Sequence, residues 1–192
     1  MNYPIIKTKL TLSCNMGLNF SKTPSFVNSV RNETSSNGGN GGVGLSFTPN
    51  QKLILGVRGN LRLTNVAYSI QKEQNQKIRN SGVDASVKWN FIKKTYLESN
   101  FNYMSYTNDR FGFDQKVPIW NVSVRQLLTK DNKIEMRLAA FDLLNRTLSI
   151  TQNGSQNYVI QTTAQTLARY FMLSMTYNVR GHETKLKNNG MF

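Results

Sequence analysis

The sequence predicts an all-β protein of about eight antiparallel, up-and-down strands, and three observations support this fold class. Apolar residues recur at every second position through most of the chain, whereas a helical period is nearly absent. The alternating segments reach about 9–11 residues, longer than the roughly 5–6 residues common in soluble strands. The segments that connect them are short and long in turn along the chain.

The strands expected in the first half each have one apolar side. In residues 10–20, leucine, cysteine, methionine and phenylalanine alternate with polar residues. Residues 43–48 and 53–64 alternate in the same way, and the turn signal PNQ at 49–51 separates them. Residues 83–91 place valine, alanine, tryptophan and phenylalanine opposite aspartate, serine, lysine and asparagine.

The second half repeats this pattern four times. Residues 97–103 follow a tight turn at 93–94, and their leucine and aromatic residues alternate with glutamate and asparagine. Residues 120–125 and 134–140 alternate apolar residues with charged, serine or asparagine residues. Residues 169–179, RYFMLSMTYNV, form the expected closing strand, whose one side is apolar throughout.

Connector length is the strongest indication of architecture. Short turns at 49–51, 93–94 and 129–133 alternate with long polar loops. These loops, which would form a ligand-binding mouth, are expected at about residues 21–40, 70–79, 107–116 and 146–165. Outer-membrane barrels have short turns at one rim and long loops at the other, whereas Greek-key sandwiches mix the two. The pattern therefore favours an antiparallel transmembrane β-barrel.

In such a barrel the apolar sides of the strands face lipid and the polar sides line the lumen. Leu173, Met175 and Tyr177 of the closing strand are predicted to face lipid. The predicted lumen-facing residues are charged: Arg58, Arg62, Asp84, Lys88, Glu98, Arg125 and Arg137. Basic residues exceed acidic ones in this set, and a narrow closed barrel would have to pair them. The excess favours residues 1–180 as one arc of a larger barrel, followed by a polar tail at 181–192.

The composition argues against several other functions. The chain has 24 Lys and Arg against 10 Asp and Glu, a net charge of +14, but the basic residues are scattered and form no stripe for nucleic acid. One cysteine and one histidine exclude an internal disulfide and a Cys/His zinc site. Nucleophile motifs, phosphate-binding loops and paired carboxylates are missing from the sequence. We therefore expect neither an enzyme nor a bound metal or cofactor.

Two polar residues near the C-terminus could be mistaken for ligand groups. Asp142 and Asn145 lie in the segment FDLLN, at the end of an expected strand. Asx side chains hydrogen-bond nearby backbone groups, so these two are expected to shape the transition from strand to loop. Cys14 shares the apolar parity of its segment and is expected to be a small packing residue.

Three stretches resemble the C-terminal part of a Bacteroidetes outer-membrane β-barrel protein of the TonB-dependent-receptor-like family. They are FSKTPSFVNSVRNET at 20–34, AFDLLNRTLSI at 140–150 and ARYFMLSMTYNVRG at 168–181. The resemblance implies a place in the outer membrane and a closing strand that the barrel-assembly machinery recognises. It also implies an N-terminal plug and further barrel strands, which this sequence lacks, and a TonB-type energiser that acts through the plug. The chain is accordingly expected to be a fragment or a truncated gene product.

The sequence is compatible with three functions. The first is a barrel segment that contributes to nutrient uptake or ligand binding at the cell surface. The second is a structural barrel or adhesin that transports nothing. The third is a soluble lipid-binding barrel, whose apolar sides would face inward instead of outward.

Overall fold

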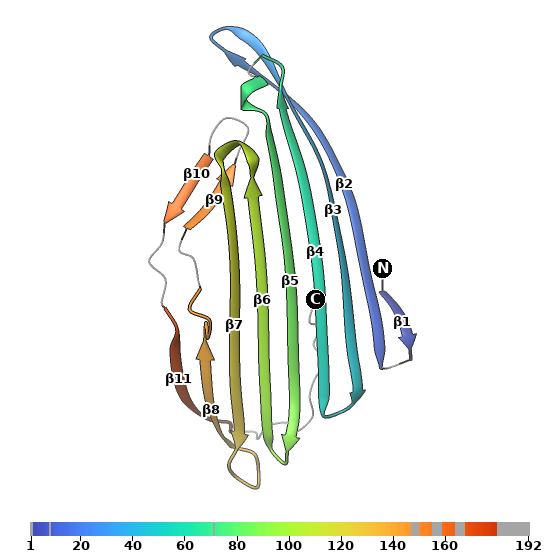
Figure 1. The fold of residues 1–192 in the computed structure, drawn as a ribbon. Coiled ribbons are helices and arrows are strands. Elements are labelled where there is room, and N and C mark those ends of the chain that lie inside the picture. The colour runs from blue at the N-terminus through green and yellow to red at the C-terminus, as the bar shows by residue number, and fades with distance from the viewer. Residues whose placement is uncertain are drawn as a thin grey trace.

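The fold is a single up-and-down antiparallel sheet with a separate small hairpin (Figure 1). The computed structural model describes residues 2–7, 9–70, 72–146, 150–154, 159–163 and 168–179. In spatial order the nine sheet strands are β1 (Asn2–Ile6), β2 (Leu10–Val27), β3 (Val30–Asn50), β4 (Leu53–Tyr68), β5 (Gln76–Ile92), β6 (Thr95–Asn108), β7 (Phe113–Leu127), β8 (Ile134–Phe141) and β11 (Tyr170–Tyr177). The hairpin pairs β9 (Ile150–Gly154) with β10 (Val159–Thr163), and two short 3-10 helices are η1 (Lys72–Gln74) and η2 (Asp109–Phe111).

The all-β, up-and-down prediction is confirmed, and each expected strand overlaps an observed one, although the expected strand at 169–179 is longer than β11. Each strand pairs with its neighbour in the sequence as far as β8, and β11 then pairs with β8. The ninth strand is β1, a short segment before residue 10 that the alternation did not reveal. Among the described residues the sheet is open, because β1 and β11 form its two edges and do not pair with each other.

The prediction of a loop at 21–40 is wrong. Residues 21–27 continue β2 and residues 30–40 begin β3, and the two strands pair from Leu10↔Phe47 to Val27↔Val30. The turn consists only of Asn28 and Ser29, both with positive φ. Composition misled the prediction, because glycine, asparagine and serine are typical of loops. Here the strand requires no apolar side chains, since cross-strand backbone pairs satisfy its polar groups.

The connectors do not sort by length between the two ends of the sheet as predicted, because the turn at 28–29 has two residues and the one at 128–133 has six. The short turns at 51–52, 93–94 and 128–133 lie at the lower end in Figure 1. The β2–β3 turn, residues 69–75 with η1 and residues 109–112 with η2 lie at the upper end. The predicted loops at 70–79 and 107–116 are therefore in the right place but shorter, because β5, β6 and β7 extend into them. Within the predicted loop 146–165 the structure describes the β9–β10 hairpin.

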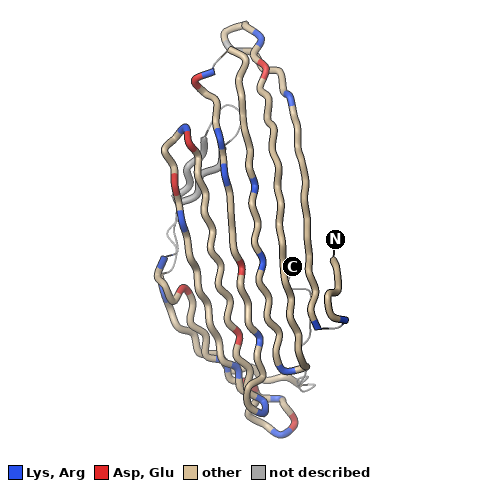
Figure 2. The backbone as a smooth tube through the Cα atoms, turned by 45° about the vertical axis from the view of Figure 1, so that its right-hand side comes forward, with Lys and Arg blue, Asp and Glu red and all other residues tan. Residues whose placement is uncertain are grey.

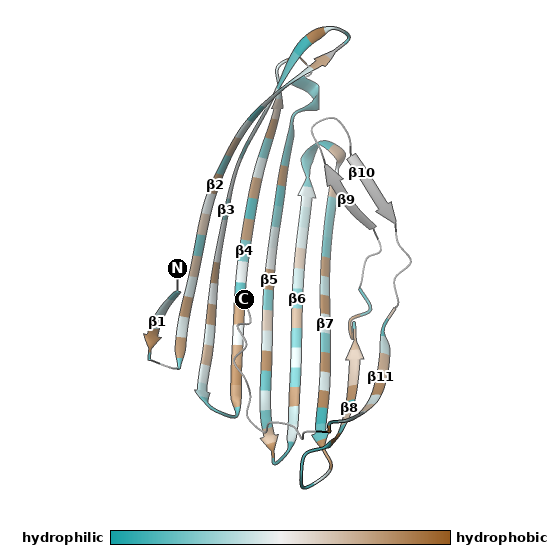
Figure 3. Cartoon of the chain, turned by 180° about the vertical axis from the view of Figure 1, so that it is seen from behind, coloured by the Kyte–Doolittle hydropathy of each residue, from teal (hydrophilic) through white to brown (hydrophobic). Residues whose placement is uncertain are grey.

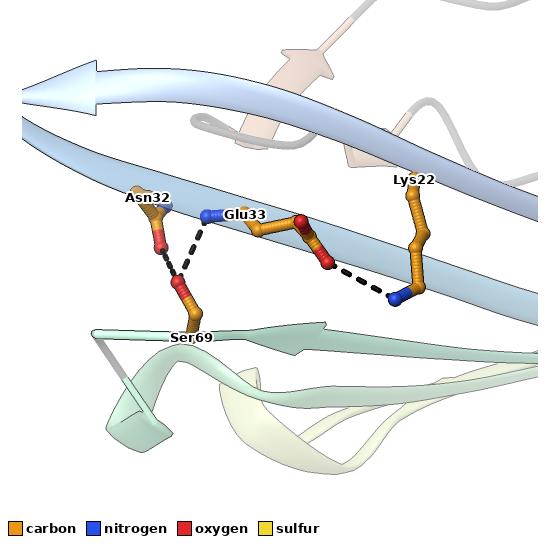
Figure 4. A network of polar contacts seen from close by, with 4 residues as sticks. All are labelled: Lys22, Asn32, Glu33 and Ser69. Carbon is orange, nitrogen blue, oxygen red and sulfur yellow. Dashed lines mark hydrogen bonds and ion pairs between the residues drawn. The ribbon is translucent and has the colours of Figure 1, made fainter.

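A hydrogen-bond network joins the β2–β3 hairpin to the connector after β4 (Figure 4). The buried Asn32 accepts hydrogen bonds at Oδ1 from Ser69 Oγ at 3.1 Å and from the Ile70 backbone N–H at 3.4 Å. Ser69 Oγ in turn accepts the Glu33 backbone N–H at 2.8 Å, and Glu33 pairs with Lys22 at 3.1 Å. Each polar group in this cluster has a partner, so the upper end of the long hairpin is fixed to β4.

The two faces of the sheet differ in polarity and in burial. We call the face that carries Arg58 and Asp84 the inner face, and the opposite one, which carries Leu173, the outer face. Figure 3 shows the resulting alternation of polar and apolar bands along the strands. Among the described strand residues other than glycine, the buried ones share the parity of the inner face: Asn32, Thr34, Ile54, Tyr68, Gln76, Tyr96, Asn108, Ser123, Leu127 and Ala139. A sheet that curves toward its inner face crowds that side and spreads the other, which explains this asymmetry.

Glycines on the inner face make room for side chains of the neighbouring strand. A Cβ atom built at Gly42 would lie 2.6 Å from Asn15 Oδ1, and one at Gly82 would lie 2.8 Å from Asn60 Oδ1. Gly17 and Gly38 are covered in the same way by Asn40 and Asn19. Asparagine amides therefore lie across glycine backbones, and the inner surface of β2 to β5 is flat and polar.

We expect Gly38→Ala to lower the free energy of unfolding by about 1–3 kcal/mol, because the new methyl group overpacks the face. Its Cβ would lie 2.8 Å from the backbone oxygen of Leu63, which cannot rotate away. Gly59→Ala is the matched control, since a Cβ there meets no atom within 4 Å. That change should be neutral or stabilising by up to about 1 kcal/mol. Urea unfolding of both variants tests the idea, and equal destabilisation would contradict it.

The turn at 128–133 contains a carboxylate with a shifted pKa. A hydrogen bond from the side chain of Thr129, with further hydrogen bonds and an ion pair from Lys133 at 3.3 Å, lowers the pKa of Asp131. Because the folded pKa lies below the unfolded one, the charged form stabilises the turn above the unfolded pKa, and this is lost as pH falls through the folded value. Thr129→Ala should raise the pKa toward its ordinary value, as measured by NMR titration. An unchanged titration midpoint would show that Thr129 has no such role.

Candidate functional site

The outer face presents long, mostly apolar rows across the sheet. One row follows the cross-strand pairs from β4 to β11 through Leu53, Trp89, Leu97, Val124, Leu138 and Leu173. The next runs from β2 to β11 through Leu10, Phe47, Leu55, Val87, Ser99, Val122, Ala140 and Phe171. The exception in that row, Ser99, accepts a hydrogen bond from Trp120 Nε1 at 2.9 Å. A surface of this length and polarity requires an apolar environment.

The residues predicted to face lipid lie on this outer face. Leu173 is 68% exposed, Met175 is 70% exposed and Tyr177 is 64% exposed. Their cross-strand partners on β8 are Leu138, Met136 and Ile134. Cys14 also lies on this face and is exposed, so the expectation that it is a small packing residue is wrong for the described structure. The reason is that an apolar parity places a residue on one side of a strand without covering that side.

A shallow apolar depression of about 1290 Å³ interrupts the outer face near β2, β3 and β4. Its floor is low because Gly39, Gly41 and Gly59 carry no side chain, whereas Leu18 and Leu61 stand beside them. Its lining is mostly apolar, although it includes the outer-face residues Asn37, Asn65 and Ser81. It is therefore a shallow dip in the apolar surface and not a site for a polar ligand.

The inner face carries all seven residues that were predicted to line a lumen. Figure 2 shows the charged positions distributed along the strands. Arg58 is the cross-strand neighbour of Asp84, and Lys88 that of Glu98. Arg137 Nη2 lies 3.6 Å from Glu98 Oε2. Opposite charges are therefore neighbours at several positions on this face, and one of these contacts, Arg137 with Glu98, is an ion pair.

A second cluster on the inner face lies near the short turns. Arg125 Nη1 lies 3.4 Å from Glu135 Oε2, and the guanidinium carbon of Arg125 lies 4.4 Å from the centre of the Tyr96 ring. Tyr96 is 1% exposed, so its ring is the floor on which the arginine stacks. We interpret the cluster as structural, because the charges of Arg125 and Glu135 neutralise each other.

A polar recess of about 300 Å³ lies farther along the inner face. Its side chains come from four adjacent strands: Asn15, Asn40, Arg58, Asn60, Arg62 and Asn80. The sequence prediction included the two arginines but missed the four asparagines. Each asparagine has the inner parity of its strand, and this parity is the signal in the sequence that could have identified it.

The segment after β8 behaves as predicted. Asp142 and Asn145 both have positive φ, which asparagine and aspartate tolerate better than most residues. Asp142 Oδ1 accepts the backbone N–H of Arg146 at 3.1 Å, and Asn145 Oδ1 accepts that of Arg169 at 3.1 Å. The two side chains thus shape the exit from the sheet.

The part of the chain that the structure describes offers no cluster of three or more His, Cys, Asp or Glu side chains that could hold a metal ion. No helix among its residues is both long enough and apolar enough to cross a bilayer.

Comparisons with known proteins give one likeness. No family model and no curated protein matches the sequence. The structure is similar to that of OmpT, an outer membrane protein of Vibrio cholerae, folded in vitro and in its trimer form, with a TM-score of 0.49 and 11% identity. The match covers 90% of this chain and 52% of the other, so the chain spans about half the length of that protein.

Proposed function

We propose that this chain forms part of the wall of a β-barrel in the bacterial outer membrane, with its outer face against lipid and its inner face toward the lumen. The observation that carries the proposal is the set of apolar rows between β2 and β11 on the exposed face, opposite a polar face that holds the buried residues. A soluble lipid-binding barrel would have the reverse arrangement, with its apolar residues on the crowded side.

The two edges of the sheet are relevant to the number of strands in the barrel. In a bilayer each backbone N–H and C=O group needs a partner within the protein. β1 and β11 are not paired with each other among the described residues, so we propose that further strands close the barrel.

Within this frame we propose a contribution to nutrient uptake or ligand binding by a TonB-dependent-receptor-like protein. The sequence resemblance described above supports this, together with the connectors after β2, β4 and β6 at one end of the sheet. The partners would be outer-membrane lipid, the barrel-assembly machinery, and a plug through which a TonB-type energiser acts. A structural barrel or an adhesin would have the same barrel wall as a transporter, but it would not take up a ligand.

Membrane fractionation of the full chain, produced in a bacterium with an outer membrane, tests the proposal. We expect extraction only with detergent and slower gel migration after heating, which is the behaviour of folded outer-membrane barrels. Recovery as a monodisperse protein without detergent would contradict it. Uptake of a labelled ligand that requires the energiser would then separate a transporter from an adhesin.

A further inference from the structure

The polar recess on the inner face contains two arginines on the same strand, and glycine and asparagine residues form the surface between them. Along β4, Arg58, Asn60 and Arg62 share the inner parity, which places the two arginine Cα atoms about 13 Å apart at roughly 3.3 Å per residue. Between them the floor is the row Gly42, Asn60 and Gly82. The amides of Asn15 and Asn60 lie over Gly42 and Gly82, so a ligand at this point would meet amide groups.

Arg62 differs from the other arginines predicted to line the lumen. Its cross-strand neighbours are Asn40 on β3 and Asn80 on β5, and the nearest inner-face carboxylate in the register is Asp84, beside Arg58. Its guanidinium group makes no hydrogen bond or ion pair with the described residues. A guanidinium group matches the geometry of an oxyanion and can bind one through two hydrogen bonds.

The asparagines around Arg62 supply the remaining hydrogen-bonding capacity. Each amide both donates and accepts, which suits hydroxyl groups. The amide oxygen of Asn80 is buried and accepts no hydrogen bond from the described residues. Such an oxygen needs a donor, because an unsatisfied buried acceptor is destabilising. The recess thus combines one available cation, amide groups and an acceptor without a donor.

We infer that this recess binds a small polyhydroxylated carboxylate, that is, a sugar acid of the hexuronic type. The carboxylate would pair with Arg62, and the hydroxyl groups would hydrogen-bond the amides of Asn40, Asn60 and Asn80. The volume of about 300 Å³ is at the small end of ligand sites, which suits a single sugar unit. The polar lining disfavours apolar ligands, and the arginines disfavour cations. This inference rests on the proposed function, since it takes the inner face as the lumen.

Calorimetric titration of the full chain in detergent tests the inference, with gel migration before and after heating as the readout of folding. The probes are glucuronate, glucose, acetate and inorganic phosphate. Glucuronate should bind more tightly than the other three. Equal binding of glucose would contradict the role of the charge, and equal binding of acetate or phosphate would contradict the role of the hydroxyl groups.

Arg62→Gln should weaken glucuronate binding by about tenfold or more while leaving the heat-modifiable form intact. Asn80→Asp should do the same, since the new carboxylate would occupy Arg62. Arg79→Gln is the control: Arg79 is the cross-strand neighbour of Leu63 on the outer face, so binding should be unchanged. Unchanged binding by Arg62→Gln would overturn the inference.

Failure of this inference and failure of the proposed function give different results. A heat-modifiable wild-type chain that binds no glucuronate overturns the sugar-acid site and leaves the barrel standing. A chain recovered without detergent and without heat-modifiable migration contradicts the barrel. The same titration on that detergent-free protein would still decide whether Arg62 binds a sugar acid.

Discussion

Leu173→Arg is expected to prevent assembly of the chain into the outer membrane. Leu173 is 68% exposed on the outer face, and its cross-strand partner is Leu138. If this face meets lipid, an arginine near the bilayer midplane costs about 2–4 kcal/mol. The variant should therefore be lost from the membrane fraction, or be found there without the heat-modifiable form, when wild-type and variant are compared at equal expression.

Thr176→Arg, three residues away on the same strand, is the matched control. Thr176 has the inner parity and pairs with Glu135, so an arginine there gains a carboxylate neighbour. It adds the same side chain to the same strand and should assemble normally. Normal assembly of Leu173→Arg, or an equal defect in both variants, would show that the assignment of the faces is wrong.

Tyr96→Ala is expected to be the most destabilising substitution on the inner face. The tyrosine is 1% exposed, and truncation of a large buried aromatic side chain typically costs about 3–5 kcal/mol. The change also removes the ring on which Arg125 stacks, a contact usually contributing about 0.5–2 kcal/mol. The midpoint of urea unfolding, followed by the fluorescence of Trp89 and Trp120, should fall markedly.

Tyr177→Ala provides the comparison for this prediction. Tyr177 is the same residue type but is 64% exposed on the outer face of β11. Its removal should cost at most about 1 kcal/mol, as is usual for exposed positions. If the two substitutions shifted the midpoint equally, the inner face would not be the packed one.

Much of the fold follows from local pattern. The alternation at residues 83–91 and 169–179 predicted both the strands and the side to which each residue belongs, because successive side chains on a strand point to opposite faces. Loop composition failed as a guide at 21–40, where polar residues of β2 and β3 satisfy their backbone groups by pairing with each other. β1 was missed because five residues carry too short a pattern to recognise.

The candidate site was only half predictable. The parity of Arg58 and Arg62 placed them on the inner face, but charge alone could not distinguish the two. The structure places Arg58 beside Asp84 and Arg62 between Asn40 and Asn80. The proposed sugar-acid site depends on this difference. It could not be predicted from the sequence of β4, because it lies in the neighbours on β3 and β5.

The sequence by itself determined which residues share a face and at which end each connector lies, because both depend on the period of a single strand and on the order of strands. Only the tertiary structure decided which residues are neighbours across the sheet and which face is crowded. Register is set by hydrogen bonds between two strands and not by the pattern of one strand, and a slip of one residue would exchange the two faces. Curvature arises from the sheet as a whole, so the burial of Tyr96 and the exposure of Leu173 could not be read from either strand alone.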